Sequence, residues 1–233
     1  MPRRARIAIA GIPSHIIQRG NNRSACFYAP EDYCRYLETH AEMALRYECA
    51  IHAHVLMTNH VHLLLSPARN DSASLLMKHL GQRYVQYINR HYRRSGTLWE
   101  GRFRSCLAQR DEYVLTCYRY IELNPVRADM VTYPCDYHWS SYRCNAHGNP
   151  RPLITPHHEY ERLGSTDAER HSAYQQLFTA HIDPERIAEI RNATNGNYVL
   201  GKNRFKEEIS RMLKRRVTRS QAGRPARRDD GGG

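Results

Sequence analysis

Three features are missing from this sequence of 233 residues. No apolar run approaches the length that crosses a membrane, which argues against a transmembrane protein. The first ten residues start basic, but their apolar stretch is short and runs into Pro13, which argues against a signal peptide. The seven cysteines are odd in number and show no Cys-x-x-Cys spacing, which argues against a disulfide framework and a cysteine zinc site. These absences predict a reduced protein of the cytoplasm with no membrane partner.

Acidic residues are scarce relative to basic ones. Thirty-five Lys and Arg face 23 Asp and Glu, which leaves a net charge of +12. A surplus of this size favours polyanionic partners, most often nucleic acid. Arg far outnumbers Lys, and a guanidinium makes planar bidentate contacts with phosphate and guanine. Composition alone fits a basic protein without a nucleic-acid partner equally well, so the sequence motifs must distinguish the two.

The order of the hydrophobic patterns predicts the fold. Strands are expected at 13–19, 49–57, from 60 onward and up to about 109, with helices from 30, at 72–94 and at 111–123. This order resembles a split βαβ, ferredoxin-like α+β sandwich with a central antiparallel sheet. Weaker helices follow at 167–180, 184–193 and 203–216. We therefore divide the chain into a sandwich domain (1–133), a mostly helical, basic extension (134–220) and a disordered basic tail (221–233).

Two histidines, His60 and His62, flank a single apolar residue, Val61. On a β-strand, residues i and i+2 project from the same face, so the two imidazoles are expected side by side while Val61 points into the core. Two imidazoles with open coordination positions suit a divalent metal, Mn²⁺ or Mg²⁺. A second pair, His52 and His54, has only Ala between its members and no evident partner, so we interpret it as structural.

Tyr120 and Asn124 lie four residues apart on the helix that ends before Pro125, and therefore share one face. The Asn124 amide oxygen offers a third metal ligand, although Asn also fits an ordinary helix C-terminus. Tyr120 is the predicted nucleophile: its attack on a metal-activated phosphodiester leaves a 5′-phosphotyrosine and a free 3′-hydroxyl. Most single tyrosines on helices only pack in the core, and Tyr113 and Tyr118 are rivals without an Asn partner.

Arginines near these motifs predict contacts with DNA phosphates. The turn cluster at 19–23 is typical of an ordinary turn, and its backbone donors also suit a phosphate. The predicted DNA-binding residues are Arg19, Asn21, Arg23, Arg83, Arg102, Arg104, Arg127 and Arg224. Arg102 and Arg104 are expected on one strand face. The basic segment 202–228 is expected to clamp the DNA, to cover the site as a brake, or to be only a solvated charge run.

Three motifs, at 57–62, 96–105 and 120–128, together resemble the REP-associated tyrosine transposases. These are bacterial single-tyrosine HUH proteins related to the transposases of small insertion sequences. The turn cluster at 19–23 and the segments 199–206 and 223–225 are also similar, so the resemblance covers nearly the whole chain.

The resemblance implies an HUH fold, a divalent metal, and cleavage and rejoining of single-stranded DNA that folds into a palindromic REP hairpin. It implies His60 and His62 as metal ligands, Tyr120 as the nucleophile and Asn124 as the third metal-site residue, where insertion-sequence relatives often carry Gln. It also implies a bacterial, nucleoid-associated cytoplasmic protein that is a monomer, with a dimer as the alternative.

Two other functions fit the same residues. A protein that binds hairpins without cutting them would need only the clustered arginines and the basic tail. A metal-dependent hydrolase that uses water would keep the histidines and dispense with Tyr120. The leading hypothesis is a DNA nickase and transposase, because neither alternative needs Tyr120 and Asn124 together with the histidine pair.

Overall fold

Five strands form one central sheet in the computed structural model, which describes residues 5–219. They are β1 (Ser14–Arg19), β2 (Cys49–Met57), β3 (His60–Pro67), β4 (Arg104–Ala108) and β5 (Val199–Leu200). The strand order is β2-β3-β1-β4-β5, and every pairing is antiparallel except that of β4 with β5. The predicted α+β ferredoxin-like sandwich is confirmed, and β3 lies inside the sheet as expected. The short strand β5 was not predicted.

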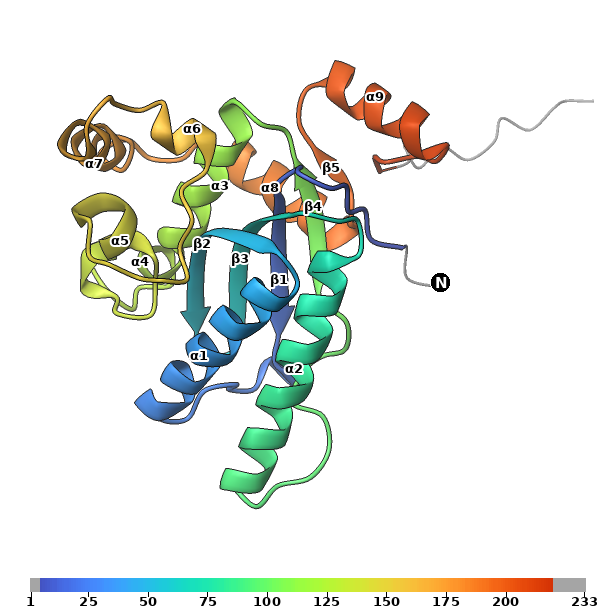
Figure 1. Cartoon of the computed structure of the whole chain (residues 1–233), viewed down its shortest axis with the longest axis vertical. Coiled ribbons are helices and arrows are strands. Elements are labelled where there is room, and N and C mark those ends of the chain that lie inside the picture. Colours follow the sequence, from blue (N-terminus) through green and yellow to red (C-terminus); the bar gives the residue numbers. More distant parts are fainter. Residues whose placement is uncertain (1–4, 220–233) are drawn as a thin grey trace, which may run out of the picture.

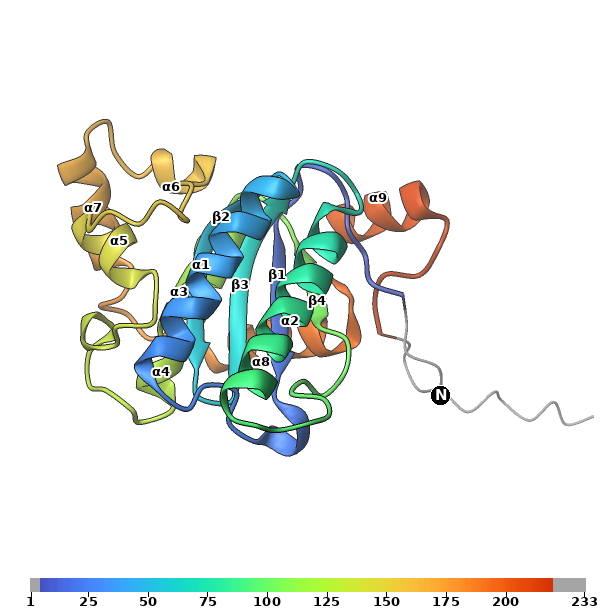
Figure 2. The same cartoon turned by 60° about the horizontal axis from the view of Figure 1, so that its bottom comes forward.

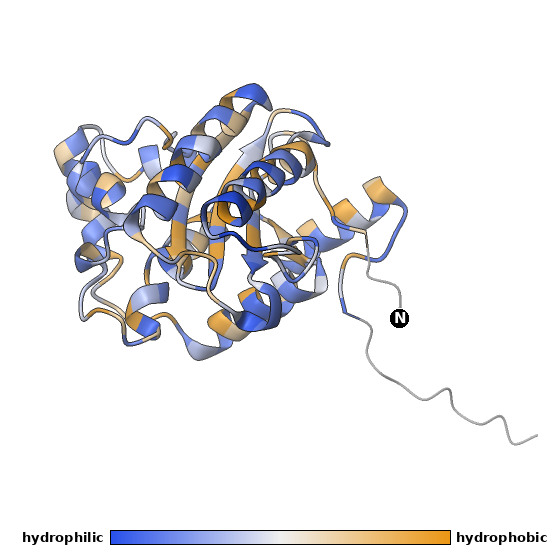
Figure 3. Cartoon of the chain, turned by 90° about the horizontal axis from the view of Figure 1, so that it is seen from below, coloured by the Kyte–Doolittle hydropathy of each residue, from blue (hydrophilic) through white to orange (hydrophobic). Residues whose placement is uncertain are grey.

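Two amphipathic helices cover one face of the sheet (Figures 1 and 2). They are α1 (Pro30–Arg46) and α2 (Ser72–His91). The helices carry both hydrophobic and hydrophilic residues (Figure 3), and the buried apolar residues of α1 and α2 belong to the core on this face of the sheet. The buried carboxylate of Asp32 accepts hydrogen bonds from the backbone N–H groups of Tyr28 (2.8 Å) and Ala29 (3.1 Å) at the start of α1. It also accepts from the hydroxyls of Tyr87 and Tyr92, so one carboxylate joins the start of α1 to the end of α2.

The other face of the sheet is covered by α3 (Glu112–Glu122) and α8 (Pro184–Gly196) (Figure 1). The side chains of β3 alternate between the two faces, as its sequence predicts. Val61, Leu63 and Leu65 are buried under α1 and α2. Leu64 belongs to the core under α3 and α8, and the two histidines of β3 share its face.

The second half of the chain returns to the same sheet. Short elements follow α3: α4 (Asn124–Arg127), α5 (Tyr142–His147), α6 (His158–Glu161) and α7 (Asp167–Gln176). The chain then packs α8 against β4 and β1, adds β5 to the sheet edge, and ends in α9 (Asn203–Leu213). Residues 184–200 therefore build on the sheet of the predicted first domain. The predicted disordered tail and Arg224 lie outside the described residues.

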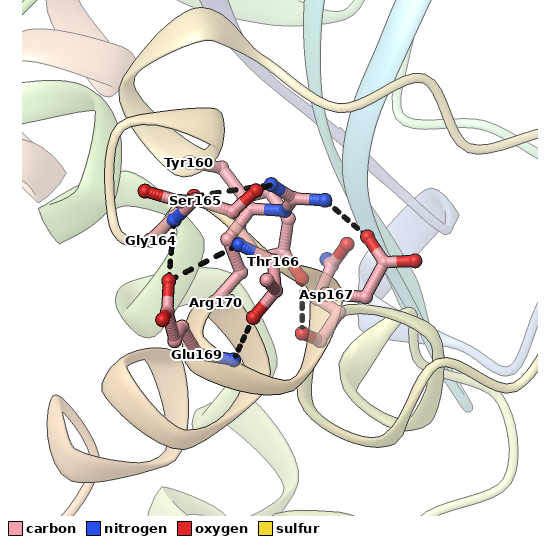
Figure 4. A network of polar contacts seen from close by, with 8 residues as sticks. Tyr160, Gly164, Ser165, Thr166, Asp167, Glu169 and Arg170 are labelled. Atoms are coloured by element: carbon pink, nitrogen blue, oxygen red, sulfur yellow. Dashed lines mark hydrogen bonds and ion pairs between the residues drawn. The ribbon is translucent and has the colours of Figure 1, made fainter.

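The start of α7 shows how tightly this extension is built (Figure 4). Thr166 Oγ1 accepts a hydrogen bond from the Glu169 backbone N–H at 3.2 Å, and the Glu169 carboxylate accepts from the backbone N–H groups of Ser165 and Thr166. This reciprocal cap satisfies donors that the first helical turn leaves free. Arg170 donates to the Gly164 carbonyl and fixes the preceding turn.

A buried carboxylate connects α3 to the extension. Glu122 accepts hydrogen bonds from Ser141 Oγ (2.5 Å), Asn145 Nδ2 (2.8 Å) and the Tyr174 hydroxyl (2.6 Å). These donors stand just before α5, on α5 and on α7. Burial raises the pKa of Glu122 to about 7, and the three hydrogen bonds act in the opposite direction. The last turn of α3 is therefore held by an acid that is neutral in mildly acidic solution.

Replacing Glu122 with Gln should flatten the pH dependence of stability. An acid whose pKa is raised on folding binds more protons in the folded state, so stability falls as pH rises from 4.5 to about 7. Urea unfolding across this range should show wild type losing about 3 kcal/mol relative to E122Q. The exposed Glu161→Gln variant serves as the control. Parallel curves for wild type and E122Q would contradict the role assigned to Glu122.

Candidate active site

The histidine pair and the candidate tyrosine meet on the α3 face of the sheet. His60 and His62 project from β3, and their ring centroids lie 5.1 Å apart. Tyr120, near the end of α3, places its ring edge-on to His62 at 5.8 Å and edge-on to His15 of β1 at 5.5 Å. Tyr120 is only 5% exposed. Strand β3 and helix α3 therefore bring the predicted residues together, beside His15 of β1.

The orientation of His62 is set by a chain of hydrogen bonds. The Thr194 hydroxyl of α8 donates to the Ile190 carbonyl at 2.8 Å, so its oxygen accepts from His15 Nδ1–H at 3.0 Å. His15 Nε2 then carries a lone pair and accepts from His62 Nδ1–H at 2.8 Å, with the two rings only 16° from coplanar. This order leaves His62 Nε2 without a hydrogen. A metal-binding imidazole needs such a nitrogen, and its other N–H is normally held in this way.

His60 is held by a shorter arrangement of the same kind. Asn59 Nδ2 donates to the Arg23 carbonyl at 3.1 Å, which turns Asn59 Oδ1 toward the ring of His60. His60 Nδ1 lies 2.6 Å from that oxygen and is therefore the protonated nitrogen. The other ring nitrogen, Nε2, is again left with its lone pair. Both histidines thus present the atom that could bind a cation.

Burial keeps these histidines neutral at physiological pH. It lowers the pKa of His60 to about 4 and that of His15 to about 3, and it lowers the pKa of His62 well below its usual range. Nearby Arg19 and Arg127 act in the same direction on His62. Neutral imidazoles are the form that coordinates metals.

Asn124 completes the set, one helical turn beyond Tyr120. Its side chain lies close enough to His60 to stabilise the charged imidazole, which acts against the lowering of the His60 pKa by burial. Its Nδ2 is buried without a hydrogen-bond partner. Two imidazole nitrogens and one amide oxygen are compatible with a divalent cation. Within residues 5–219, no group of three or more His, Cys, Asp or Glu side chains is arranged to hold a metal, so Asn124 would have to supply the third ligand.

Arg127 of α4 lies against Tyr120. Its guanidinium carbon stands 4.4 Å from the centre of the Tyr120 ring, and its Nη2 donates to the Tyr120 carbonyl at 2.6 Å. Burial lowers the pKa of Arg127 to about 10. Its Nε and Nη1 have no hydrogen-bond partner. A cation with free donors therefore lies beside the candidate nucleophile.

The other predicted DNA-binding residues divide into two groups. Arg19, Arg102 and Arg104 line one small cleft beside the histidines, together with Asn195 of α8. Arg102 precedes β4, which begins only at Arg104, so the two do not share a regular strand as predicted. By contrast, Arg83 of α2 pairs with a carboxylate of α1 on the opposite face of the sheet.

The turn cluster lies next to the site. Asn21 and Arg23 belong to a short 3-10 turn (Asn21–Arg23), in which residues 22 and 23 have positive φ. The Arg23 carbonyl accepts a hydrogen bond from Asn59, and Asn59 orients the His60 ring, so this turn contributes to the position of His60.

No helix of the described residues has the length and apolar character needed to span a membrane.

The rival residues lie elsewhere. His52 is bonded to the Thr155 carbonyl and to Ser66 Oγ, which uses both its ring nitrogens. His54 is completely buried, and its ring nitrogens have no partner. The Tyr118 hydroxyl accepts from the His157 backbone N–H, and Tyr113 packs against Arg186. None of these four side chains faces His62.

Sequence reasoning missed His15, Asn59 and Thr194. His15 lies two and four residues before Ile17 and Arg19, so strand alternation places all three on one face. That spacing could have indicated a third histidine near the pair. Thr194 gave no local signal, because its role depends on how α8 packs against β1.

Parts of this sequence and fold are similar to those of known proteins. Residues 9–124 match the family model described as "Transposase IS200 like". A solved REP-associated tyrosine transposase bound to a REP hairpin aligns with a TM-score of 0.55 and 17% identity, over 67% of this chain and 93% of that chain. No curated protein matches the sequence.

Two further solved structures align less well. A candidate transposase from Deinococcus radiodurans gives a TM-score of 0.37 at 16% identity, over 59% of this chain and 98% of that one. A tRNA(His) guanylyltransferase from Saccharomyces cerevisiae gives 0.38 at 12% identity, over 79% and 86%.

The hydrogen-bond chain predicts a specific cost at Thr194. In T194V the His15 N–H loses its acceptor while the side-chain volume is nearly kept, and an unpaired buried donor costs about 1–3 kcal/mol. Urea unfolding should show this loss. The T194S variant keeps the hydroxyl and is the matched control. Equal stability of T194V and T194S would contradict the proposed order of donors and acceptors.

Proposed function

Over residues 9–124 this chain belongs to the IS200-like transposase family, and from that premise we propose that it cuts and rejoins single-stranded DNA through Tyr120. The observation that carries the proposal is the contact of the Tyr120 ring with His62, one helical turn from Asn124. A nucleophile and a candidate cation site share one small region, which is what in-line attack on a phosphodiester requires.

We propose that His60 Nε2, His62 Nε2 and Asn124 Oδ1 hold a divalent cation, Mg²⁺ or Mn²⁺. When bound, the cation would stabilise the charge that develops on the phosphate oxygens. The support for this assignment is the free nitrogen on each neutral imidazole and the position of the Asn124 side chain beside His60. Asn59 and His15 orient the two rings.

In the proposed reaction, Tyr120 Oη attacks the phosphorus and loses its proton. The new Oη–P bond forms as the bond from phosphorus to the 3′-oxygen breaks, and that oxygen leaves as a 3′-hydroxyl after taking up a proton. The product is a 5′-phosphotyrosine. Because the phosphodiester energy is retained, a second 3′-hydroxyl can attack the phosphotyrosine and rejoin the strand without ATP. The Arg127 guanidinium, 4.4 Å from the centre of the Tyr120 ring, places a positive charge beside the proposed nucleophile.

We further propose that the substrate folds into a hairpin with single-stranded flanks. The support is the fold shared with a transposase bound to a REP hairpin, together with a net charge of +12 and a cleft lined by Arg19, Arg102 and Arg104 beside the site. Phosphate contacts of this kind make binding strongly dependent on salt. The alternative function is hairpin binding without cleavage.

Replacing Tyr120 with Phe should abolish covalent attachment to DNA and leave hairpin binding intact. The variant removes only the attacking oxygen, while the phosphate contacts remain. A labelled hairpin oligonucleotide with flanks is incubated with protein and Mn²⁺, and the covalent band is measured on a denaturing gel. Y113F, on the same helix but away from the histidines, is the control. Cleavage that survives in Y120F would favour a hydrolase that uses water.

Metal binding should depend on one histidine pair and not on the other. H62N should weaken Mn²⁺ binding by more than about 100-fold, since loss of a supporting partner alone costs about 10–100-fold. H52N, in the second His-x-His pair, should leave it unchanged. Calorimetric titration of each folded variant measures this directly. Equal affinities in wild type and H62N would remove the proposed cation site, whatever the DNA assays show.

A further inference from the structure

The hydrogen-bond chain behind His62 owes its direction to a hydroxyl group of the extension. His15 Nδ1 lies 3.0 Å from Thr194 Oγ1, and His15 Nε2 lies 2.8 Å from His62 Nδ1. A neutral imidazole carries one N–H hydrogen, on either nitrogen. In the first arrangement, His62 Nδ1–H donates to His15 and His15 Nδ1–H donates to Thr194. In the second, Thr194 donates to His15 Nδ1 and His15 Nε2–H donates to His62.

The two arrangements differ in what His62 offers to a cation. Coordination uses an imidazole nitrogen with a free lone pair. In the first arrangement His62 Nε2 has that lone pair. In the second, His62 Nε2 carries a hydrogen, and the lone pair lies on Nδ1 and is taken up by His15. Neither the net charge nor the ring positions differ, so a group outside the two rings has to select the arrangement.

The surroundings of the Thr194 hydroxyl favour the first arrangement. Its oxygen lies 2.8 Å from the Ile190 carbonyl oxygen, a distance that fits an O–H···O hydrogen bond. If the single hydroxyl hydrogen turned to His15, these two oxygens would face each other without a hydrogen between them. Cys106 Sγ lies 3.3 Å from the same hydroxyl, and burial raises the pKa of the Cys106 thiol to about 12. The thiol therefore keeps its hydrogen and can donate it to Thr194.

Water is kept away from this chain of side chains. Thr194 and His62 are each 3% exposed, and His15 is 1% exposed. A buried N–H group needs a partner within the protein, and leaving it without one is costly. The positions of the hydrogens are therefore set by protein groups rather than by solvent.

Thr194 is held opposite His15 by the last turn of α8. Asn197 ends this helix in a left-handed conformation, and its Oδ1 accepts a hydrogen bond from the Ser105 backbone N–H of β4 at 3.0 Å. Arg104 Nη1 donates to Asn195 Oδ1 at 3.1 Å. Two bonds to β4 thus fix the turn that carries Thr194, beside the strand that carries His15.

We propose that Thr194 is a positioning residue of the cation site: acting through His15, its hydroxyl keeps the hydrogen of His62 on Nδ1 and so leaves Nε2 open to a divalent cation. A helix of the extension thereby controls a site whose three proposed ligands lie within the family match. By linkage, a cation bound at His62 strengthens the contact of α8 with β1 in return. The inference rests on the proposed cation site, but the hydrogens of His62 are measurable without any cation.

The first test is the position of these hydrogens in metal-free protein at neutral pH. Long-range ¹H–¹⁵N NMR correlation distinguishes Nδ1–H from Nε2–H imidazoles, and the H62N spectrum identifies the His62 signals by their loss. Wild type and T194S should show His62 protonated on Nδ1. T194V should show it on Nε2, because an unpartnered buried N–H is avoided more strongly than an unpartnered acceptor. His62 protonated on Nε2 in wild type, or on Nδ1 in T194V, would overturn the proposal.

The second test is the affinity for Mn²⁺, measured by calorimetric titration of the folded proteins. T194V should bind about tenfold or more weakly than wild type, the effect of losing a supporting partner, and T194S should bind like wild type. Ile190→Val is the matched control, because it removes a buried methyl group from the same helix and keeps the Thr194 hydroxyl and the Ile190 carbonyl. I190V should lose stability in urea at unchanged Mn²⁺ affinity. Equal weakening in I190V and T194V would reduce Thr194 to a structural role.

The linkage has its own measurement. Mn²⁺ should slow amide hydrogen exchange in residues 184–197 of wild type, measured by mass spectrometry, and should have a smaller effect in T194V. Exchange in this segment that is indifferent to bound Mn²⁺ in wild type would remove the coupling between α8 and the cation site.

The two proposals fail separately. If the His62 hydrogens lie as expected in wild type and T194V but wild type does not bind Mn²⁺, the role of Thr194 in orienting His62 stands and the cation site falls. If wild type binds Mn²⁺ and T194V binds it equally well, the cation site stands and the positioning role of Thr194 falls.

Discussion

The geometry of the candidate active site depends on the hydrogen bond between His15 and His62. It transmits the position of α8 through Thr194 to the ring that would hold a cation, so the site is built from β1, β3 and a helix of the second half of the chain. The family match ends at residue 124 and includes Tyr120 and the three proposed cation ligands. The hydrogen bonds that support His62 start with His15 inside this range but end at Thr194 beyond it. The extension is thus part of the site's structure, whatever else it contacts.

Helix α3 is constrained from both sides in a similar way. Tyr120 faces the histidines. Glu122 points into the extension and accepts hydrogen bonds from three side chains, one just before α5, one on α5 and one on α7. Arg127 then bonds back to the Tyr120 carbonyl. A nucleophile must be held within fractions of an ångström to react in line, and these bonds fix the helix that carries the proposed nucleophile at its C-terminal end. The packing of the extension and the position of Tyr120 therefore depend on the same set of contacts.

Much of this was predictable from local pattern. The period of two in β3 predicted that His60 and His62 share a face, and Pro125 predicted where α3 ends. The rest depends on contacts between distant segments. β5 has two residues and gains its place only by pairing with β4. Arg83 and Arg102 look alike in sequence, but only the first has a carboxylate neighbour, and an arginine already paired must give up that bond to bind phosphate. The course of residues 101–103 is likewise set by β1, because Arg104 pairs with Ile17 and the Glu100 backbone N–H donates to the Arg19 carbonyl.

Unsatisfied polar atoms lie beside the proposed nucleophile. Asn124 Nδ2 and two nitrogens of Arg127 lack partners there. By contrast, the buried carboxylates of Asp32 and Glu122 are surrounded by donors. Unpaired buried groups cost stability in the free protein, and a ligand that supplies their partners recovers it. DNA that contacts Asn124 and Arg127 would therefore stabilise the fold by more than its phosphate contacts elsewhere, because it would satisfy groups that the protein leaves open beside Tyr120.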